Sequence, residues 1–388
     1  MQRIYLDYNA TAPSAPEALA ELVACQTEAF GNPSSLHWAG QAARLRLDRA
    51  RQQVAALLGA RPEEIVFTSG ATEADNLVLQ GLAGAHSGGH IVTTAIEHQG
   101  VLAPCRQLEA RGFRVTRVLP GADGVVSAAA VAAALAPDTF LVSVMLANND
   151  TGVVQPVREI AALARARGCA VHTDATQAVG KMAVDVRELG VGYLTLSAHK
   201  LAGPKGVGAL FCRDGQAPTA QILGGGQESG HRAGTENLPA IAGFGRACAL
   251  ARESLAAEAV RLRALRDRLE TGLRTRFPGV RFNGCPEPRL PNTLNVSFPG
   301  VSALLLVLNL DLLGIAISAG SACSSGSDEP SHVLLAMGQS PTDARGAVRF
   351  SLGAGTTTGE VDATLAALAQ ILPRLQPHGA AAALPPAP

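Results

Sequence analysis

Residues 170–200 read AVHTDATQAVGKMAVDVRELGVGYLTLSAHK and contain two apolar runs, 170–173 and 193–197, each followed by polar residues. Runs of this length and composition predict buried β-strands. Strands that are apolar throughout are typical of parallel sheets with helices on both faces. The polar segments 174–177 and 197–200 would then lie at the carboxyl edge of the sheet, where such folds bind ligands.

The same alternation of strands and helices extends over residues 60–215. Further strands are expected at 65–67, 90–94, 114–118, 140–146 and 208–211. Helices are expected between them, near 73–82, 100–110, 127–135 and 157–167. The pattern predicts an α/β fold with a mostly parallel sheet covered by helices. Polar residues also follow three of these other strands, so five strand ends should converge on one crevice, at 69–72, 97–98, 148–149, 174–177 and 197–200.

The chain beyond residue 215 predicts a smaller α+β unit. A long connecting helix is expected over 246–277, followed by strands at 292–298, 315–318 and 347–352. Thr357 and Glu360 have the spacing of a capping box that opens a last helix over 361–372, which Pro373 should end. The residues from 377 onward are mostly Ala and Pro, so we expect them to be disordered.

The composition is that of a large globular chain. Of its 388 residues 47% are hydrophobic and 16% are charged, which excludes an intrinsically disordered protein. The 32 basic residues Lys and Arg balance 32 acidic ones, so nothing indicates nucleic acid or an anionic membrane as a partner. The N-terminus lacks the pattern of a targeting peptide. The apolar stretch 301–320 contains Asn309, Asp311 and Gly314, so it predicts a buried helix and a strand instead of a membrane span.

Cysteines occur at positions 25, 105, 169, 212, 248, 285 and 323. Their number is odd and no CxxC pair occurs, so we predict neither a disulfide framework nor a metal site. Free thiols are typical of the reducing cytoplasm, where we expect this protein. Cys323 lies in the Gly- and Ser-rich stretch 318–327, where a thiol would be exposed enough to act as a nucleophile or sulfur carrier. An ordinary loop cysteine is the alternative, although cysteine is usually buried.

Only three of the basic residues are lysines, Lys181, Lys200 and Lys205. Lys200 follows the apolar strand 193–197, where it is poorly suited to packing but well placed to form a Schiff base with an aldehyde cofactor. A loop lysine that points to solvent is the alternative. We adopt that solvent-facing interpretation for Lys181 and Lys205, because both lie in glycine-rich turns.

Asp174 is a candidate partner for such a cofactor, 26 residues before Lys200. A buried carboxylate there could keep the pyridine nitrogen of pyridoxal phosphate protonated, so that the ring accepts electrons. Gln177 could hydrogen-bond the ring hydroxyl. An ordinary helix N-cap is the alternative for Asp174 alone.

The segment Thr68-Ser69-Gly70-Ala71-Thr72 joins a strand to a helix and could hold a phosphate at the positive helix end. Ser197 and His199 could add donors, although helix capping explains the Ser and Thr residues equally well. Arg349 lies in an apolar strand, where an arginine requires a carboxylate partner. That partner is either a substrate carboxylate or an internal acid.

With these residues in place, the sequence resembles the cysteine desulfurases, pyridoxal-phosphate enzymes of the class V aminotransferase group, especially their nitrogen-fixation and housekeeping iron–sulfur branch. The resemblance covers nearly the whole chain. The matching motifs are Tyr5-Leu6-Asp7-Tyr8-Asn9-Ala10-Thr11-Ala12, Gly31-Asn32-Pro33-Ser34-Ser35, residues 68–76, Glu97-His98, Asn148-Asn149, Asp174-Ala175-Thr176-Gln177, Ser197-Ala198-His199-Lys200, Arg232-Ala233-Gly234-Thr235-Glu236-Asn237, Ser321-Ala322-Cys323 and Arg349-Phe350-Ser351-Leu352-Gly353.

The resemblance implies fold type I of the pyridoxal-phosphate-dependent transferases. The large domain would comprise residues 14–258, the small domain residues 1–13 and 259–376, and a disordered tail residues 377–388. It also implies a homodimer, in which Thr235 of one subunit binds the phosphate of the cofactor in the other.

The resemblance further implies roles for cofactor-binding residues. Lys200 would hold the cofactor and later act as the base on the substrate. His98 would stack on the ring and take part in proton transfer. Asp174 and Gln177 would bind the ring nitrogen and the ring oxygen. The phosphate end would be held by Ala71, Thr72, Ser197, His199 and Thr235.

For the substrate, the resemblance implies that Asn149 and Arg349 hold the carboxylate of L-cysteine. The thiol of Cys323 would take the sulfur as a persulfide, L-alanine would leave, and the sulfur would pass to an acceptor protein. The sequence differs from the family pattern at two places that concern the second subunit and the sulfur acceptor. Ser229 and His231 stand where the family often has arginines near the dimer contact, and the Ala/Pro tail differs from the helical tail that meets the scaffold in housekeeping members. The acceptor, in iron–sulfur cluster assembly or related sulfur transfer, therefore stays open.

Three other functions compete with this one. A selenocysteine lyase or cysteine-sulfinate desulfinase of the same fold is the alternative, although the Gly/Ser-rich stretch around Cys323 favours sulfur delivery to proteins. A nicotinamide oxidoreductase is suggested by the glycines of 353–359, but no strand follows to supply the ribose-binding acid. A non-catalytic scaffold would lack at least one of Lys200, Asp174, His98 and Cys323.

Overall fold

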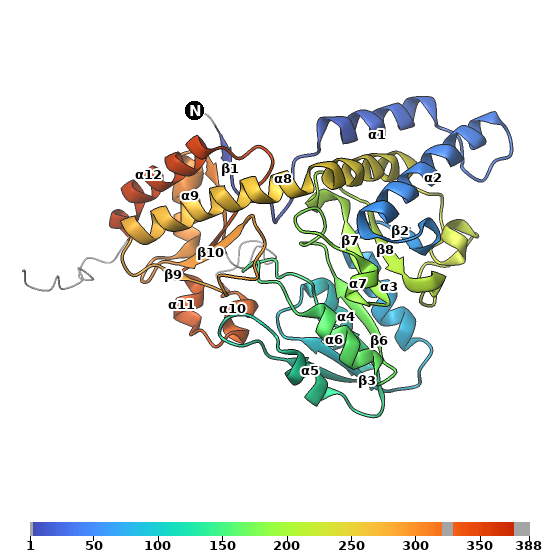
Figure 1. Cartoon of the computed structure of the whole chain (residues 1–388), viewed down its shortest axis with the longest axis horizontal. Coiled ribbons are helices and arrows are strands. Elements are labelled where there is room, and N and C mark those ends of the chain that lie inside the picture. Colours follow the sequence, from blue (N-terminus) through green and yellow to red (C-terminus); the bar gives the residue numbers. More distant parts are fainter. Residues whose placement is uncertain (1–2, 320–328, 376–388) are drawn as a thin grey trace, which may run out of the picture.

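A computed structural model describes residues 3–319 and 329–375 of the chain (Figure 1). Its larger half contains a seven-stranded sheet with the strand order β2-β8-β7-β6-β5-β3-β4. Only β8 runs against the others, because it pairs antiparallel with both β2 and β7. The predicted mostly parallel sheet is therefore confirmed. Its strands are β2 (Ile65–Thr68), β3 (His90–Thr94), β4 (Arg114–Val118), β5 (Thr139–Ser143), β6 (Ala170–Asp174), β7 (Tyr193–Ser197) and β8 (Gly208–Cys212).

Helices cover both faces of this sheet, because successive residues of a strand point to opposite faces. Ile91 and Leu141 pack against α3 (Ala71–Ala83) and α4 (Gln99–Ala110) on one face. Their neighbours Val92 and Val142 belong to the main core on the other face. The helices that contribute to this main core include α1 (Pro16–Glu28), α2 (Trp38–Leu58), α5 (Ala128–Ala134), α6 (Val157–Arg165), α7 (Val186–Leu189) and α8 (Leu238–Arg276).

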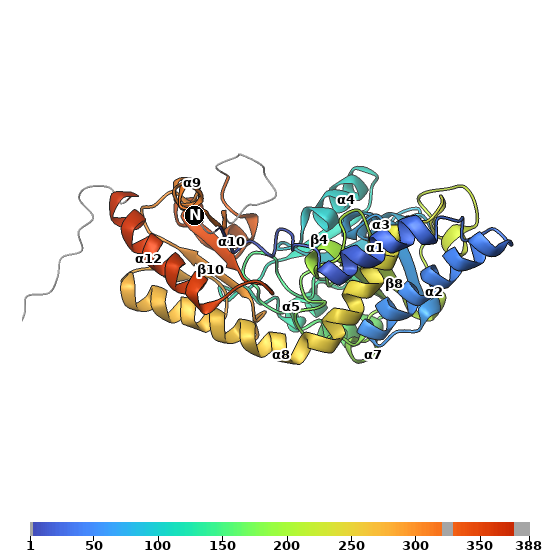
Figure 2. The same ribbon diagram turned by 90° about the horizontal axis from the view of Figure 1, so that it is seen from above.

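The long helix α8 connects the two halves of the molecule, as Figures 1 and 2 show. It begins at Leu238, eight residues before the predicted start, and Gly243 and Gly245 lie inside this extra stretch. A Cβ at Gly243 would lie 2.9 Å from Ala18 O, and one at Gly245 would lie 2.6 Å from Ala50 Cα. The two glycines therefore let α8 pack closely on α1 and α2, and this tertiary packing offsets their low helix propensity.

The smaller half contains a four-stranded sheet with the order β12-β13-β10-β9 and a parallel pair, β1 and β11. A separate core joins these strands to α8, α9 and α12, with Leu6, Leu269, Phe350 and Leu368 at its centre. The division of the chain into the two predicted domains stays a prediction. The elements are β1 (Ile4–Tyr5), β9 (Arg281–Phe282), β10 (Thr293–Ser297), α9 (Ala303–Leu312), β11 (Ile315–Ala316), β12 (Ser318–Ala319), α10 (His332–Ala336), α11 (Pro341–Arg345), β13 (Ala347–Ser351) and α12 (Thr358–Leu375).

Two predicted elements of this half differ in the structure. The strand predicted at 315–318 is two short strands, because β11 pairs with β1 whereas β12 pairs with β13 of the other sheet. Helix α12 continues past Pro373 to Leu375. A proline removes one hydrogen bond of the helix, and the buried side chains of Ile371 and Leu372 keep the last turn packed.

The capping box at the start of α12 is confirmed. Thr357 N donates to Glu360 Oε2 at 2.8 Å, and Glu360 N donates to Thr357 Oγ1 at 3.2 Å.

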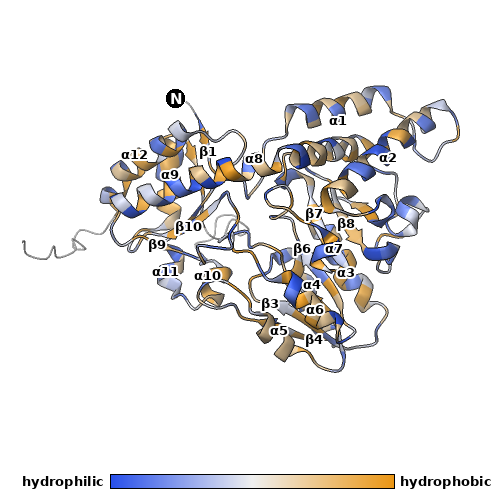
Figure 3. Ribbon diagram, viewed as in Figure 1, coloured by the Kyte–Doolittle hydropathy of each residue, from blue (hydrophilic) through white to orange (hydrophobic). Residues whose placement is uncertain are grey.

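The sequence of α9, ALLLVLNLDL, is mainly apolar, and Figure 3 shows the hydropathy of each residue along the ribbon. The predicted helix is present but only partly buried, because Leu304, Leu305, Leu308 and Leu312 are exposed. Within residues 3–319 and 329–375, no helix combines the length and the apolar character needed to cross a bilayer.

Candidate active site

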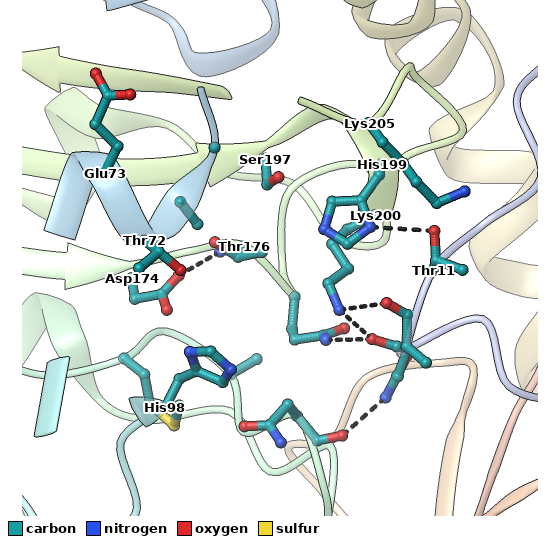
Figure 4. A pocket seen from close by; sticks show the side chains of 18 of the residues that line it. Thr11, Thr72, Glu73, His98, Asp174, Thr176, Ser197, His199, Lys200 and Lys205 are labelled. Atoms are coloured by element: carbon teal, nitrogen blue, oxygen red, sulfur yellow. Dashed lines mark hydrogen bonds between the residues drawn. The ribbon is translucent and has the colours of Figure 1, made fainter. Parts of the chain in front are cut away.

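A cavity of about 580 Å³ lies at the carboxyl ends of β2, β3, β5, β6 and β7, and the segment 9–11, Lys205, Gly206 and Arg349 complete its lining (Figure 4). The five strand ends that were expected to converge therefore do meet. Predicted site residues that line the cavity are Ala71, Thr72, His98, Asn149, Asp174, Gln177, Ser197, His199, Lys200 and Arg349.

Lys200 ends the short 3₁₀ turn Ala198–Lys200 that directly follows β7. Its side chain is half-buried and its Nζ donates to the carbonyl oxygens of Asn9 and Ala10, the latter at 2.8 Å. Figure 4 shows that the side chain points toward the N-terminal segment that contains Thr11. The alternative of a solvent-facing loop lysine is therefore wrong.

Lys181 is also not the solvent-facing lysine that the sequence suggested. Its side chain is buried, and its Nζ donates to Gln177 Oε1 at 2.6 Å and to Asn9 Oδ1 at 3.1 Å. Burial lowers the pKa of Lys181 well below its usual value, and the charges of Lys200 and Arg349 act in the same direction. The glycine-rich turn misled the prediction because Gly180, with a φ of 80°, turns the chain so that Lys181 reaches Gln177 and Asn9. Lys205 is exposed, as expected, at the edge of the cavity.

Asp174 ends β6 at the floor of the cavity and is buried. Its Oδ1 accepts a hydrogen bond from Thr176 N at 2.9 Å, so it closes a turn instead of capping a helix. A second buried carboxyl, Asp75, lies behind it, with Oδ1 3.6 Å from His172 Nε2. Burial and the charge of Asp174 raise the pKa of Asp75 well above its usual value. Asp174, and not Asp75, is the carboxyl of this pair that lines the cavity.

The residues predicted to hold a phosphate lie where β2 leads into α3. Gly70 occupies the N-cap and supplies no side-chain hydrogen bond, so the first N–H groups of the helix, at Ala71 and Thr72, face the cavity without a side-chain cap. His199 lies across the cavity, with Nδ1 3.1 Å from Thr11 Oγ1. Burial and the neighbouring lysines, Lys200 first, lower the pKa of His199 to about 4, so it is a neutral hydrogen-bonding group at pH 7.

His98 is held at the N-terminus of α4. Its Nδ1 accepts from Gly100 N at 3.0 Å, so the neutral ring carries its proton on Nε2. The preceding residue, Glu97, is fully buried and accepts from Met145 N at 2.9 Å and from Thr94 Oγ1 at 2.7 Å. Burial raises the pKa of Glu97 to about 8, against the effect of these hydrogen bonds. The carboxyl group of Glu97, directly before His98 in the chain, is therefore mainly neutral at pH 7.

Arg349 and Asn149 also line the cavity. Arg349 is buried in β13, where Nη1 donates to Asn149 O at 3.0 Å and Nη2 pairs with Asp7 Oδ1 at 2.8 Å. The internal salt bridge that the sequence allowed is therefore present. The guanidinium also lines the cavity, so it is close enough to meet a bound carboxylate.

Three buried polar atoms on the cavity lining have no hydrogen-bond partner among the described residues: Asn149 Oδ1, Thr176 Oγ1 and Arg349 Nε. Buried polar groups are normally paired, so a bound polar molecule would complete them. Together with the lysine, the carboxylate of Asp174 and the uncapped helix start, this lining fits a phosphorylated aldehyde cofactor and an amino-acid carboxylate.

One described site residue, Thr235, does not line the cavity. Thr235 is exposed in the segment before α8. Cys323 lies outside the described residues. The other six cysteines, at positions 25, 105, 169, 212, 248 and 285, are all buried. Burial raises the pKa of each of these six thiols, so none of them is a ready nucleophile.

The most important residue that sequence reasoning missed is Asn9. It is buried, and its side-chain Nδ2 donates to Asn149 O at 3.1 Å and to Thr293 Oγ1 at 2.9 Å. Its backbone carbonyl accepts from Gln177 Nε2 at 2.9 Å as well as from Lys200. The motif that contains Asn9 matched the family, but a local motif does not show which side chain reaches the cavity.

Comparison with known proteins agrees with this site. The sequence pattern of the aminotransferase class-V family matches residues 4–364. A protein named cysteine desulfurase from Cereibacter sphaeroides is 48% identical over 386 residues, which cover 98% of this chain and 99% of that protein. Cysteine desulfurase IscS from Clostridium botulinum strain Hall is 44% identical over 375 residues, covering 96% and 94%. A solved structure named NifS-like protein superposes with a TM-score of 0.91 at 39% identity and covers 96% of this chain and all of its own.

Proposed function

The chain belongs to the class-V aminotransferase family, and from this premise we propose that it is a pyridoxal-phosphate-dependent cysteine desulfurase. It would convert L-cysteine to L-alanine and transfer the sulfur as a persulfide on Cys323. The observation that carries the proposal is the placement of Lys200, Asp174 and Arg349 around one cavity, which joins a basic nitrogen, a buried acid and a guanidinium in a single site. Relatives over the whole chain that are named cysteine desulfurase support the substrate.

The cavity offers a partner for each polar part of pyridoxal phosphate. Lys200 would hold the aldehyde carbon, and Asp174 would keep the ring nitrogen protonated. Gln177 would donate to the ring oxygen. When bound, the cofactor supplies an electron sink that stabilises negative charge at the substrate Cα. The phosphate would lie at the start of α3 and be held by Ala71, Thr72, Ser197 and His199.

The remaining residues would position the amino acid and move its protons. Arg349 and Asn149 would hold the substrate carboxylate, which orients the Cα–H bond toward Lys200. Lys200 Nζ would remove that proton once it is released from the cofactor. His98 is held by its Nδ1 hydrogen bond, so Nε2 would be the nitrogen that exchanges a proton.

Cys323 is the candidate sulfur acceptor by exclusion as well as by motif. The six described cysteines are buried thiols with raised pKa values, which leaves Cys323 as the seventh. Its thiolate would attack the substrate sulfur, so that a new S–S bond forms while the Cβ–S bond breaks and its electron pair returns to the carbon skeleton. L-alanine leaves after protonation.

The proposal includes a homodimer in the cytoplasm with a protein as the final sulfur acceptor. Thr235 is exposed and outside the cavity, which is compatible with its binding the phosphate of a second subunit. Phe30, Leu36 and Trp38 form an exposed apolar surface that a second subunit would cover. The relative named IscS supports iron–sulfur cluster assembly as the destination of the sulfur.

Spectroscopy of the purified full chain tests this proposal. The wild type is expected to be yellow, and with L-cysteine and a reductant it should form alanine and sulfide in equal amounts. Lys200→Ala should lose the absorbance of the lysine-bound cofactor. Cys323→Ala should bind cysteine yet release little sulfur, whereas Cys285→Ala, a change at a buried thiol, should keep the wild-type rate.

Two results would contradict the proposal. A colourless protein that stays inactive after pyridoxal phosphate is added would exclude the cofactor. A yellow protein that leaves L-cysteine unchanged but acts on selenocysteine or cysteine sulfinate would keep the cofactor and replace the substrate.

A further inference from the structure

Lys181 is a buried cation behind the cavity wall, and none of the assigned roles uses it. It is not a cavity-lining residue, but both of its acceptors, Gln177 and Asn9, are. Both accepting atoms are neutral amide oxygens. A buried ammonium with only neutral partners is destabilising compared with an apolar side chain of similar length. Packing alone therefore gives no reason for a lysine at this position.

Lys181 and the backbone oxygen of Asn9 together determine which way the amide of Gln177 faces. Lys181 Nζ donates to the side-chain oxygen of Gln177 at 2.6 Å. The amide nitrogen is consequently on the other side, where Nε2 donates to Asn9 O at 2.9 Å. A half-turn of the amide would break both hydrogen bonds and bring the oxygen of Gln177 against Asn9 O, so Lys181 and Asn9 O together hold the amide nitrogen as a donor in its present place.

The same lysine fixes the side chain of Asn9. Asn9 Oδ1 accepts from Lys181 at 3.1 Å and from Asn292 Nδ2 at 3.2 Å, while Asn9 Nδ2 donates to Asn149 O. The backbone oxygen of Asn9 then receives hydrogen bonds from both Gln177 and Lys200. One connected network therefore runs from Lys181 through Gln177 and Asn9 to Lys200.

We propose that Lys181 is a positioning residue that, by occupying the oxygen of Gln177, keeps the nitrogen of this amide as the donor presented to the ring oxygen of the cofactor. The inference rests on the proposed function, since the ring oxygen belongs to pyridoxal phosphate. A donor at this place stabilises the ring oxygen as an anion. It therefore strengthens cofactor binding and lowers the pH at which the nitrogen that joins Lys200 to the cofactor loses its proton.

A double-mutant cycle in the full-length chain tests this role. The variants are Lys181→Met, Gln177→Leu and the double variant. The readouts are the dissociation constant of pyridoxal phosphate and the pH midpoint of the visible absorbance of the loaded protein. Each single change should weaken binding about tenfold and raise the pH midpoint, and the double variant should match the single variants instead of adding their effects.

Arg266→Met is the matched control, because Arg266 is also a buried cation but bonds Leu290 O and Asp267, which lie outside the cavity lining. It is expected to lower thermal stability without moving either readout. Lys181→Gln keeps a donor for Gln177 without a charge, so it should retain affinity within about threefold of the wild type.

The possible results distinguish a failure of the proposed role of Lys181 from a failure of the proposed function. A wild type that does not bind pyridoxal phosphate refutes the proposed function. A wild type that binds it, with Lys181→Met unchanged in both readouts or with effects that add to those of Gln177→Leu, refutes the positioning role alone. If Lys181→Met does not fold, Gln177→Leu is tested in the Lys181→Gln background, where it must still weaken binding about tenfold. The absence of that effect also refutes the role.

Discussion

Arg349 Nη2 lies 2.8 Å from Asp7 Oδ1, although 342 residues separate them in the sequence. The pair joins the N-terminal segment to β13 at the edge of the cavity. Asp150 Oδ1 lies 3.5 Å from Nη1 of the same guanidinium. The arginine is thus held in place by internal acids while its Nε has no described partner and the side chain lines the cavity. An internal salt bridge and a substrate-binding role are therefore compatible.

This arrangement predicts different effects for the two partners. Arg349→Lys replaces a planar fork with a point charge, and it should raise the KM for L-cysteine about 10- to 100-fold with the cofactor still bound. Asp7→Asn removes the internal pair but keeps the guanidinium, so KM should not rise. Steady-state alanine formation and the cofactor absorbance of each variant measure both effects. A KM that rises equally in both variants would show that Arg349 acts only through the salt bridge.

Gly208 at the start of β8 permits the close approach of the segment that begins α3. A Cβ there would lie 2.7 Å from both Gly70 Cα and Leu196 O, which are backbone atoms that cannot move independently. Gly208→Ala should therefore lower the free energy of unfolding by about 1–3 kcal/mol and weaken pyridoxal-phosphate binding about tenfold. Urea denaturation and cofactor titration provide the two measurements.

Gly84→Ala serves as the control for this substitution. Gly84 has a φ of −60°, and the nearest atom to an added Cβ is at 3.4 Å. Its stability should stay within about 0.5 kcal/mol of the wild type, and its cofactor affinity should not change. If Gly208→Ala behaves like Gly84→Ala, the backbone contact at Gly70 does not determine the phosphate site.

The raised pKa of Glu97 leads us to expect that the free energy of unfolding depends on pH. This pKa is raised by burial from 4.5 to about 8 in the folded chain, and the nearby charge of Asp174 acts in the same direction. The folded state therefore holds the proton more tightly than the unfolded chain. The stabilisation is complete below pH 4.5 and decreases as the pH rises toward 8, with a slope of at most about 1.4 kcal/mol per pH unit.

Glu97→Gln should make this slope smaller, because the amide does not ionise, whereas the buried Asp75, whose pKa is also raised, still contributes. Urea unfolding between pH 5 and pH 9 measures it, with the exposed Glu188→Gln as the control that should keep the wild-type slope. Parallel pH profiles for the wild type and Glu97→Gln would contradict a protonated Glu97.

The exposed apolar surface at Phe30, Leu36 and Trp38 predicts self-association. Trp38 is 72% exposed and packs edge-on against Phe30, with ring centroids 6.2 Å apart. Trp38→Glu would place a charge in the buried interface, so it should shift the protein from dimer to monomer in sedimentation experiments. Cofactor affinity should fall with it, because Thr235 would no longer reach the neighbouring site.

Leu312→Glu changes an equally exposed leucine on α9, in the other half of the molecule, and should leave the dimer intact. A wild type that sediments as a monomer, or a Trp38→Glu variant that remains dimeric, would contradict this assignment of the interface.

Local sequence patterns were sufficient to predict the sheet and most of one side of the cavity. The strands at 90–94, 114–118 and 193–197 agree residue for residue with β3, β4 and β7. A continuous apolar run indicates a strand that is buried on both faces, and this signal lies within the strand's own residues. Polar residues directly after such strands must lie at one edge of a parallel sheet, so the strand pattern alone places Asp174 and Lys200 together.

Contacts between residues far apart in the sequence decided the start of α8 and the pairing of residues 315–318, which local patterns do not predict. The glycines at 243 and 245 argue against a helix, yet contacts with α1 and α2 make α8 begin at Leu238. The stretch 315–318 reads as one strand, but its two ends pair with strands of different sheets. In both cases the deciding contacts involve residues far away in the chain.

The sequence by itself determined the α/β architecture, the family and the lysine, aspartate and histidine expected at the cavity, because periodicity and contiguous motifs are encoded locally. Only the tertiary structure decided that Asn9 reaches Lys200, that Asp7 pairs with Arg349 and that Lys181 is buried against Gln177. These contacts form where the N-terminal segment and the small half close over the large sheet. The strength of these contacts depends on how deeply the groups are buried and on which groups they bond. Both are determined only when the chain has folded.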